Sequence, residues 1–318
     1  MNFHPEAMAV ETAFRMDVEE VSDILSVMIR HETTIYRRSD YLAQDSRFAK
    51  ILDGPWRQRI IEWMFSVTDH CSLKRDCVAV ASHYLDLCVD RGVVESRQQF
   101  QLVAMTALQL AIKLYDSTVV RLDSMIKLGR GLFTERDVIN MEFKILSSLK
   151  WQVHPPTANC FLRQYIRLLP PSVSPPVRYM LTEVTRFIAE ITVCLYSFVD
   201  SQPSVVAYAA LLIALSRIDE SAVPLWQREQ IHHIMHHTTQ LDHLGPVVQA
   251  ATKNLHAALE KNISLRNLMK TIDDHCVAEG LSSTYIADNR QLHFNMKGLP
   301  TGLHSPRDVA PTPTLHAN

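Results

Sequence analysis

The sequence predicts an all-α protein, and two observations carry this prediction. Apolar residues recur along the 318-residue chain with the spacing of helices, whereas the alternation of apolar and polar residues typical of strands is nearly absent. Only eight glycines occur, and prolines separate the helical runs. With 47% hydrophobic and 21% charged residues, the chain is long enough for two helical domains with sizeable cores.

The N-terminal half is predicted to begin with a flexible segment, residues 1–17, and a helix with its connector, residues 18–54. The helix covers about residues 18–34 and has its apolar residues on one side. A first domain of five helices then fills residues 55–153. Proline at position 55 suits the start of the first helix, and Thr134-x-x-Asp137 is suited to cap the last. The five helices are expected at residues 55–69, 74–89, 98–113, 123–128 and 134–151.

His154-Pro155-Pro156 interrupts the helical pattern, and we place the domain boundary there. A second domain, residues 154–262, is predicted to hold five further helices. Its third helix, SVVAYAALLIALS, resembles the third helix of the first domain, LVAMTALQLAIK, which indicates a structural repeat with a buried central helix in each unit. A C-terminal extension, residues 263–318, is predicted to be disordered from about residue 280. The five helices are expected at residues 157–168, 176–196, 203–216, 225–237 and 246–261.

Composition and motifs exclude several classes of function. A net charge of −2 argues against broad binding to nucleic acid, and no uncharged apolar run reaches the ~20 residues of a membrane span. The six cysteines form no CxxC pair, which favours reduced thiols in the nucleus or cytoplasm. The histidine run IHHIMHH offers neighbouring rings on a helix but too few ligands for a structural metal, so we expect none. No enzyme motif or cofactor-binding loop is visible.

Two apolar helices stand out as a candidate binding surface. The run from Gln101 to Ser117 carries no charge before Lys113, and the run from Val138 to Trp151 has Glu142 as its only acid. A cation and an anion at the margins of two such helices suit the docking of another protein better than a plain core. The alternative is an internal Lys113–Glu142 ion pair.

Five segments together resemble the cyclins in their order and spacing: WRQRIIEWM, ASHYLDLCV, QLVAMTALQLAIK, NMEFKILSSLKW and PPTANCFLRQY. The resemblance covers about residues 39–164 strongly and residues 177–216 more weakly. It implies a tandem five-helix fold that binds and activates a cyclin-dependent serine/threonine kinase in cell-cycle progression, and it implies no catalysis by the chain itself. One alternative is a cyclin of a transcription-associated kinase, and another is a cyclin-fold transcription factor that binds DNA.

The resemblance also assigns roles to single residues. Lys113 and Glu142 match the lysine and glutamate that cyclins present to the kinase, and four residues match the apolar surface around them: Leu110, Leu114, Leu146 and Trp151. Arg57 and Asp86 match a structural ion pair between the first two helices of the first domain.

Four residues fall where many cyclins carry a docking groove for Arg-x-Leu motifs of kinase substrates: Trp56, Ile60, Trp63 and Gln101. The chain departs from that pattern because Arg59 and Ser66 replace an apolar residue and an acid, and both changes oppose capture of an arginine-bearing peptide. The alternative is that Ile60 and Trp63 belong to the core.

Features of the cyclin subclasses are mixed. LSSLKW resembles plant D-type cyclins, whereas PTANCFLRQY resembles A- and B-type cyclins. After Lys113 the chain has Leu114, Tyr115 and Asp116, where mitotic cyclins continue with an aromatic residue and two acids. In the C-terminal extension, Ser305 and Thr312 precede prolines and are candidate sites for proline-directed phosphorylation.

Overall fold

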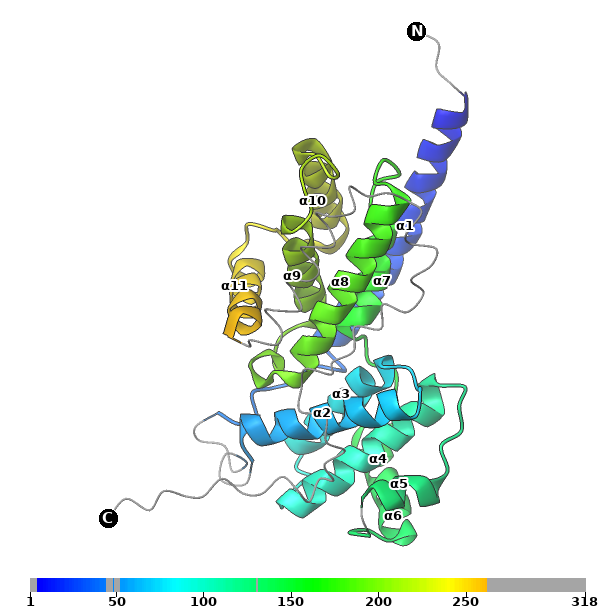
Figure 1. Cartoon of the computed structure of the whole chain (residues 1–318), viewed down its shortest axis with the longest axis vertical. Coiled ribbons are helices and arrows are strands. Elements are labelled where there is room, and N and C mark those ends of the chain that lie inside the picture. Colours follow the sequence, from blue (N-terminus) through cyan, green and yellow to red (C-terminus); the bar gives the residue numbers. More distant parts are fainter. Residues whose placement is uncertain (1–4, 44–47, 49–51, 130, 262–318) are drawn as a thin grey trace, which may run out of the picture. The chain divides into compact units, whose positions relative to one another are not determined.

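A computed structural model of the chain describes residues 5–43, 48, 52–129 and 131–261 (Figure 1). Within these residues every regular element is a helix, which confirms the predicted all-α class. The chain divides into two compact units. Among the described residues, the N-terminal unit consists of Arg38–Pro155 together with Val193–Asp200, and the C-terminal unit consists of Pro156–Thr192, residues 201–261 and the first helix of the protein.

Within residues 52–129, 131–155 and 193–200, the N-terminal unit contains five α-helices and a short 3-10 helix. Their bounds are α2 (Gly54–His70), α3 (Asp76–Asp90), α4 (Arg97–Tyr115), α5 (Leu122–Leu128), α6 (Glu135–Ser148) and η2 (Tyr196–Phe198). The helices of the C-terminal unit are α1 (Pro5–Thr33), α7 (Ala158–Arg167), α8 (Pro175–Cys194, whose last two residues belong to the N-terminal unit), α9 (Pro203–Ser216), α10 (Leu225–Thr239) and α11 (Pro246–Lys261).

Side-chain caps explain where several helices of the N-terminal unit begin. Asp53 accepts a hydrogen bond from the backbone N–H of Trp56 at 2.7 Å and so caps α2. At the start of α6, Thr134 accepts from the Asp137 N–H at 3.3 Å while the Asp137 carboxylate accepts from the Thr134 N–H at 2.8 Å. The capping box read from Thr134-x-x-Asp137 is therefore present in the structure.

Each unit is built around a helix that is apolar on nearly all sides. In the N-terminal unit α4 packs against α3, α6 and α2, and the residues from Val103 to Ile112 are buried. In the C-terminal unit α9 packs against α7 and α11, with residues 204–211 and 213–215 buried. Alanines at several positions of both helices let the neighbouring backbones approach closely. These two helices are the ones whose sequences resemble each other.

The first helix is longer than the sequence predicts. It begins at Pro5 rather than at Val18, so most of the segment expected to be flexible is helical. The physical reason is that the chain between Pro5 and Val18 contains neither proline nor glycine and is rich in good helix formers, while proline suits the first helical position. α1 packs against α7 and α10, and its Val21 and Leu25 side chains are fully buried.

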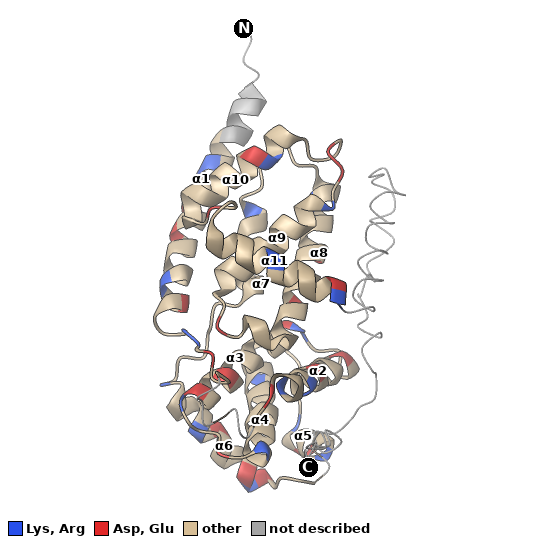
Figure 2. Ribbon diagram, turned by 90° about the vertical axis from the view of Figure 1, so that its left-hand side faces the viewer, with Lys and Arg blue, Asp and Glu red and all other residues tan. Residues whose placement is uncertain are grey.

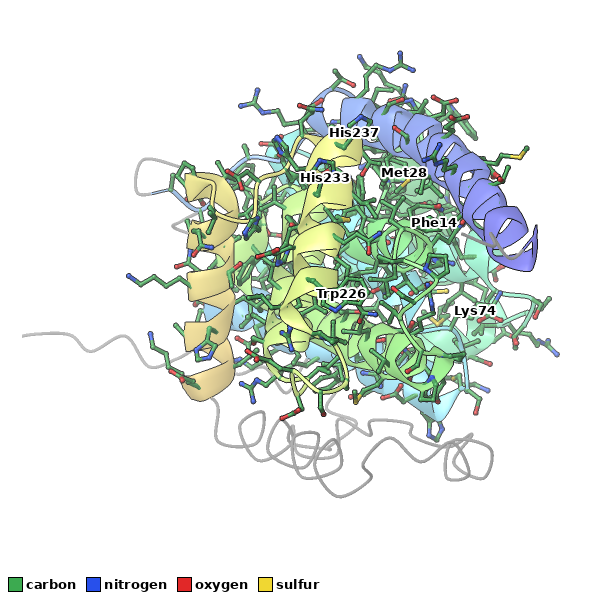
Figure 3. All side chains as sticks on the ribbon, turned by 90° about the horizontal axis from the view of Figure 1, so that it is seen from above. Phe14, Met28, Lys74, Trp226, His233 and His237 are labelled. Carbon is green, nitrogen blue, oxygen red and sulfur yellow. The ribbon has the colours of Figure 1, made fainter. Side chains whose placement is uncertain are left out.

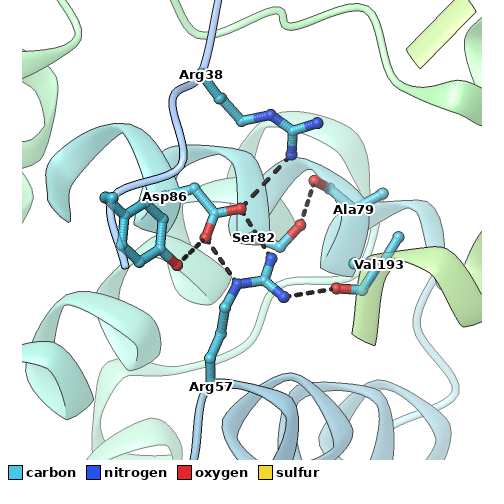
Figure 4. A network of polar contacts seen from close by, with 7 residues as sticks. Arg38, Arg57, Ala79, Ser82, Asp86 and Val193 are labelled. Atoms are coloured by element: carbon cyan, nitrogen blue, oxygen red, sulfur yellow. Dashed lines mark hydrogen bonds and ion pairs between the residues drawn. The ribbon is translucent and has the colours of Figure 1, made fainter. Parts of the chain in front are cut away.

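A buried polar network joins distant segments of the N-terminal unit (Figure 4). Arg57 on α2 donates from Nε and Nη2 to the two carboxylate oxygens of Asp86 on α3, at 2.9 and 2.8 Å, and the two residues are 2% and 1% exposed. Tyr41 donates to Asp86 at 2.8 Å, and Arg38 lies 3.5 Å from it. Arg57 also donates to the carbonyl of Val193 at 3.0 Å. The network thereby ties the connector before α2 and the chain after residue 192 to the same pair of helices.

Both charges of the ion pair are stabilised by this geometry. Burial by itself would lower the pKa of the Arg57 guanidinium, but the Asp86 carboxylate outweighs it and the pKa lies above its ordinary value. Burial and the negative charge of Asp86 raise the pKa of Tyr41 well above its ordinary value. The Arg57–Asp86 pair expected from the sequence is thus part of a fully satisfied buried cluster, the arrangement in which a buried ion pair is tolerated.

Candidate functional site

Lys113 and Glu142 lie side by side at the surface of the N-terminal unit. Lys113 is in the last turn of α4, and Glu142 is in the middle of α6. Lys113 Nζ donates to Glu142 Oε2 at 2.7 Å and to Glu142 Oε1 at 2.9 Å. The Lys113 side chain is 48% exposed and the Glu142 side chain 24%. The internal ion pair considered from the sequence is therefore formed, yet both groups remain open to solvent.

The energy of this pair is too small for it to hold the fold together. An exposed ion pair between a lysine and a carboxylate contributes on the order of 0–1 kcal/mol, because water screens the charges and both side chains lose rotamer freedom. Lys113 has three donors, and the carboxylate of Glu142 has more lone pairs than one ammonium group can fill. Both groups therefore keep hydrogen-bonding capacity for another protein.

The amphipathic pattern of α6 places Glu142 in the middle of an apolar surface. Val138, Met141 and Ile145 are buried, and they fix the side of α6 that packs against the unit. Another side of the helix carries residues at i, i+3, i+4 and i+7, a spacing that aligns them in one stripe: Ile139, Glu142, Phe143 and Leu146. We call these four residues the α6 stripe.

The exposure of the surrounding apolar residues defines the rest of the surface. Ile139 is 54% exposed, Phe143 66%, Leu114 41% and Trp151 65%, while Leu146 is half-buried. Large apolar side chains gathered at this exposure around one ion pair are characteristic of an interaction site rather than of ordinary surface. Ile139 and Phe143 did not figure in the prediction, although their helical spacing from Glu142 and Leu146 was a signal that could have found them.

One residue of the predicted surface lies elsewhere. Leu110 is only 4% exposed, so its side chain belongs to the core and does not share the accessible surface with Leu114. The physical reason is the burial of α4 on nearly all sides, which makes a run of apolar residues uninformative about which of them reaches solvent.

An unusual backbone conformation presents Trp151. Lys150 and Trp151 have φ angles of 52° and 62°, in the left-handed region that residues other than glycine rarely adopt. The Trp151 N–H donates to the carbonyl of Leu146 at 2.9 Å, which closes the end of α6. Beyond it, Tyr115 donates to the carbonyl of Val153 at 3.1 Å. Such strained conformations persist where the surroundings hold them, and they are concentrated at functional sites.

The three residues after Lys113 have distinct positions. Leu114 is exposed, whereas Tyr115 reaches back to residues 153 and 154, with its hydroxyl 2.9 Å from His154 Nδ1. Asp116 accepts from the backbone N–H groups of Lys74 at 2.7 Å and Thr118 at 2.8 Å. These hydrogen bonds lower the pKa of the Asp116 carboxyl. Two of the three residues thus serve the local fold, and Leu114 alone adds to the candidate surface.

The candidate groove for Arg-x-Leu motifs is not open in the structure. Trp56 is 2% exposed, Ile60 0% and Trp63 6%, so these side chains form core contacts, as in the ring contact of Trp56 with Phe100 at 5.0 Å. Gln101 is half-buried. The expected groove is therefore corrected: its three apolar members face the interior of the unit. The alternative that placed Ile60 and Trp63 in the core agrees with the structure.

The histidine run and the phosphorylation candidates were the other sites considered from the sequence. His232 is 3.1 Å from the Tyr208 hydroxyl through Nδ1, and its ring stacks on that of His243 at 4.1 Å. Among the described residues, no group of three or more histidine, cysteine or acidic side chains is placed to hold a metal ion, and no helix is long and apolar enough to cross a membrane. Ser305 and Thr312 lie outside the described residues.

Both signs of charge occur in each unit. Figure 2 shows acidic and basic residues along α1 and in both units. Single helices can differ, since α3 carries only acids and α7 only arginines. A protein that binds nucleic acid through its phosphates needs a concentrated positive face. The described helices therefore give the DNA-binding alternative no support.

Comparison with known proteins agrees with the resemblance seen in the sequence. Residues 23–154 match the family model "Cyclin, N-terminal domain", and residues 156–281 match "Cyclin, C-terminal domain". The chain is 27% identical to Cyclin-A2-1 of Arabidopsis thaliana over 190 residues, covering 60% of this chain and 42% of the relative. It is also 27% identical to Cyclin-A2-1 of Oryza sativa subsp. japonica over 225 residues, covering 71% and 44%.

The chain thus spans less than half the length of these two curated relatives, both of which are plant A-type cyclins. A solved viral cyclin from herpesvirus saimiri has a similar fold, with a TM-score of 0.52 at 14% identity over 64% of this chain and 84% of that one. Since the two family matches together cover most of the sequence and the helices follow the predicted tandem order, the chain belongs to the cyclin family.

Proposed function

We propose that this chain is the regulatory subunit of a cyclin-dependent serine/threonine kinase, that it activates the kinase and that it acts in cell-cycle progression. The observation that carries the proposal is the accessible Lys113–Glu142 pair within an exposed apolar surface made by the α6 stripe, Leu114 and Trp151. We call this whole surface the α4–α6 surface. The chain itself would perform no chemistry.

Each group of the surface has a role in the proposed complex. The ammonium of Lys113 is suited to donate to backbone carbonyls at the end of a kinase helix. The carboxylate of Glu142 is suited to accept backbone N–H groups or to pair with a kinase cation. Phe143 and Trp151 would bury their rings against the apolar side of that helix, where aromatic anchors contribute most of the binding energy of an interface.

Activation would follow from preferential binding to one kinase conformation. An active kinase needs the glutamate of its mobile helix against the lysine that contacts ATP. A cyclin that holds this helix in place binds the active conformation more tightly than the inactive one, so the equilibrium shifts toward the active form. Moving a kinase from mostly inactive to mostly active requires a preference of about 10⁴-fold. A surface with several large anchors is able to supply this preference.

The test is co-purification of the kinase with the full chain from a synchronised lysate, followed by mass spectrometry. We expect Lys113→Ala with Glu142→Ala, and separately Phe143→Ala, to abolish recovery of the kinase while circular dichroism stays unchanged. Lys144→Ala is the matched control, because Lys144 is an exposed cation on α6 outside the stripe. If the double variant retained the kinase, the α4–α6 surface would not be the binding site.

The identity of the recovered kinase separates the two kinase-based alternatives. A cell-cycle kinase supports the proposal, and a kinase of the transcription machinery supports the other. Recovery of chromatin without a kinase would favour the DNA-binding alternative. We further propose that the protein acts in the nucleus and the cytoplasm, which imaging of a fluorescent fusion would test.

A further inference from the structure

A second exposed apolar site lies in the C-terminal unit, at the first turn of α10. Leu225 is 61% exposed and Trp226 58%, and the two are adjacent in the chain. Figure 3 shows Trp226 on α10, with His233 and His237 further along the same helix. By contrast, Trp56 and Trp63 in the other unit are almost completely buried. An exposed tryptophan beside an exposed leucine is a large apolar area that the fold of this unit does not use.

The turn that carries these two side chains is held rigidly. Arg228 donates from Nε to the carbonyl of Val223 at 2.8 Å, and its two terminal nitrogens donate to the carbonyls of Leu215 and Ile218. Gln227 is 6% exposed and donates to the carbonyl of Ser172 at 3.2 Å. A partner binding here would therefore meet a backbone turn that is already fixed and need not order it.

The exposed charges between residues 218 and 230 have one sign. Arg228 is the only cation between residues 218 and 230, and its guanidinium faces backbone carbonyls rather than solvent. The acids of the same segment, Asp219, Glu220 and Glu229, are exposed. Glu229 lies three residues after Trp226 and four after Leu225, so it shares their side of the helix.

The chain segment next to this turn adds no positive charge. Ser172, which accepts from Gln227, belongs to the connection between α7 and α8, and residues 168–176 contain no charged side chain. Of the two arginines that flank this connection, Arg178 donates to the carbonyls of Ile166, Leu169, Pro170 and Val173. The other, Arg167, pairs with Asp17 and Glu20 of α1. Arg178 and Arg228 thus donate to backbone carbonyls, and the exposed charges within residues 218–230 are the three acids.

From this complementarity we propose that Leu225 and Trp226 form a docking site for a short segment of another protein, in which an apolar residue is flanked by lysine or arginine. The apolar residue would cover Leu225. A neighbouring cation would lie over the face of the Trp226 ring, an interaction that strengthens as water is excluded. A further cation would pair with Glu229. The site is independent of the α4–α6 surface and shares no residue with it.

The experiment measures fluorescence anisotropy of a labelled peptide in which leucine stands between arginines, titrated with the full chain. The matched probe has each arginine replaced by glutamate. We expect only the arginine probe to bind, with an affinity that falls as salt is added because exposed charges are screened. Trp226→Ala and Glu229→Lys should each weaken binding about tenfold, the effect of losing one anchor of a small interface.

Two controls make the outcome specific. Val247→Ala removes an apolar residue of the same unit that is 63% exposed, and Phe143→Ala removes one from the α4–α6 surface. Both variants should bind the arginine probe as the parent chain does, and circular dichroism should match in all variants. Equal binding of the two probes, undiminished binding by Trp226→Ala, or no binding at millimolar peptide would overturn the proposal. A dimer that Trp226→Ala abolishes in sedimentation velocity would also overturn it, because a second copy would then occupy the site.

Discussion

Glu32, in the last turn of α1, accepts hydrogen bonds from the backbone N–H of Ser204 at 2.9 Å and from the Ser204 hydroxyl, in the first turn of α9. Glu32 is 4% exposed, and α9 has no side-chain cap from its own N-cap residue, Gln202. A carboxylate on α1 therefore caps α9, although Glu32 and Ser204 are 172 residues apart in the sequence. Its negative charge also lies at the positive end of the α9 dipole.

This relationship predicts that α1 contributes directly to the stability of the C-terminal unit. Glu32→Ala leaves the buried N–H of Ser204 without its acceptor and should lower the free energy of unfolding by about 1–3 kcal/mol. Asp23→Ala removes an exposed acid from the same helix and should change it by no more than about 0.5 kcal/mol. Urea denaturation followed by circular dichroism gives both values. Equal effects of the two substitutions would show that the cap adds nothing.

The Asp86 cluster predicts a larger loss from a single substitution. Asp86→Asn removes the negative charge that faces Arg57 and Arg38, and it leaves a buried cation without compensation. The cost should be about 3–5 kcal/mol. Asp69→Asn is the control, because Asp69 pairs with Arg75 at 3.0 Å but is 38% exposed, and this change should cost less than about 1 kcal/mol. Urea denaturation of the two variants measures both costs. Similar midpoints for Asp86→Asn and Asp69→Asn would contradict the stabilising role of the Asp86 cluster.

Helix positions could be predicted closely where the sequence marks their ends. Pro203–Ser216 and Pro246–Lys261 have the predicted bounds, because a proline fixes each start. α10 extends two residues beyond its predicted end, to Thr239, and stops where Gln240 adopts a left-handed φ of 61°. Glycine or asparagine at this position would have predicted such a stop, whereas glutamine does not. The start of α1 was missed because its first turns have helix-forming residues without a clear apolar stripe.

The site was predictable in part, and the limits have physical causes. The helical spacing of Glu142 and Leu146 places both on one side of α6, while Val138, Met141 and Ile145 form the buried side. Helical spacing cannot predict which apolar residues of α4 reach solvent, because almost all of that helix is buried. Leu110 and Leu114 are both leucines in an apolar run, yet Leu110 is buried and Leu114 is exposed. The buried state of Trp56 and Trp63 and the cap from Glu32 to Ser204 depend on packing between segments far apart in sequence, which local patterns do not encode.

Reversing the Lys113–Glu142 pair separates its structural contribution from binding. In Lys113→Glu with Glu142→Lys the two opposite charges still face each other, so the free energy of unfolding should change by less than about 1 kcal/mol. A kinase that contacts each group would meet the wrong charge at both positions, and the repulsion should abolish co-purification. Kinase recovery beside a thermal melt checks both expectations. Binding that survives the reversal would mean that the pair serves only to join α4 and α6.

The His232 cluster predicts acid sensitivity of the C-terminal unit. Burial, the nearby His243 and Arg228 lower the pKa of His232 from 6.5 to about 4, and its ring contacts the Tyr208 hydroxyl. The unfolded chain therefore takes up a proton near pH 6.5, whereas the folded chain resists it until about pH 4, so stability falls as the pH drops through this interval.

Because His232 is partly solvated, the effect of this ring should be on the order of 1 kcal/mol. His83 in the N-terminal unit has a pKa lowered in the same direction by its burial, so the parent chain shows both effects and the contribution of His232 must be read from a variant. His232→Gln keeps a polar side chain toward Tyr208 but does not titrate. Its melting temperature should fall less than that of the parent between pH 6.5 and 4. His236→Gln changes an exposed ring on the same helix and should keep the parent dependence. Parallel curves for the parent and His232→Gln would place the acid sensitivity elsewhere.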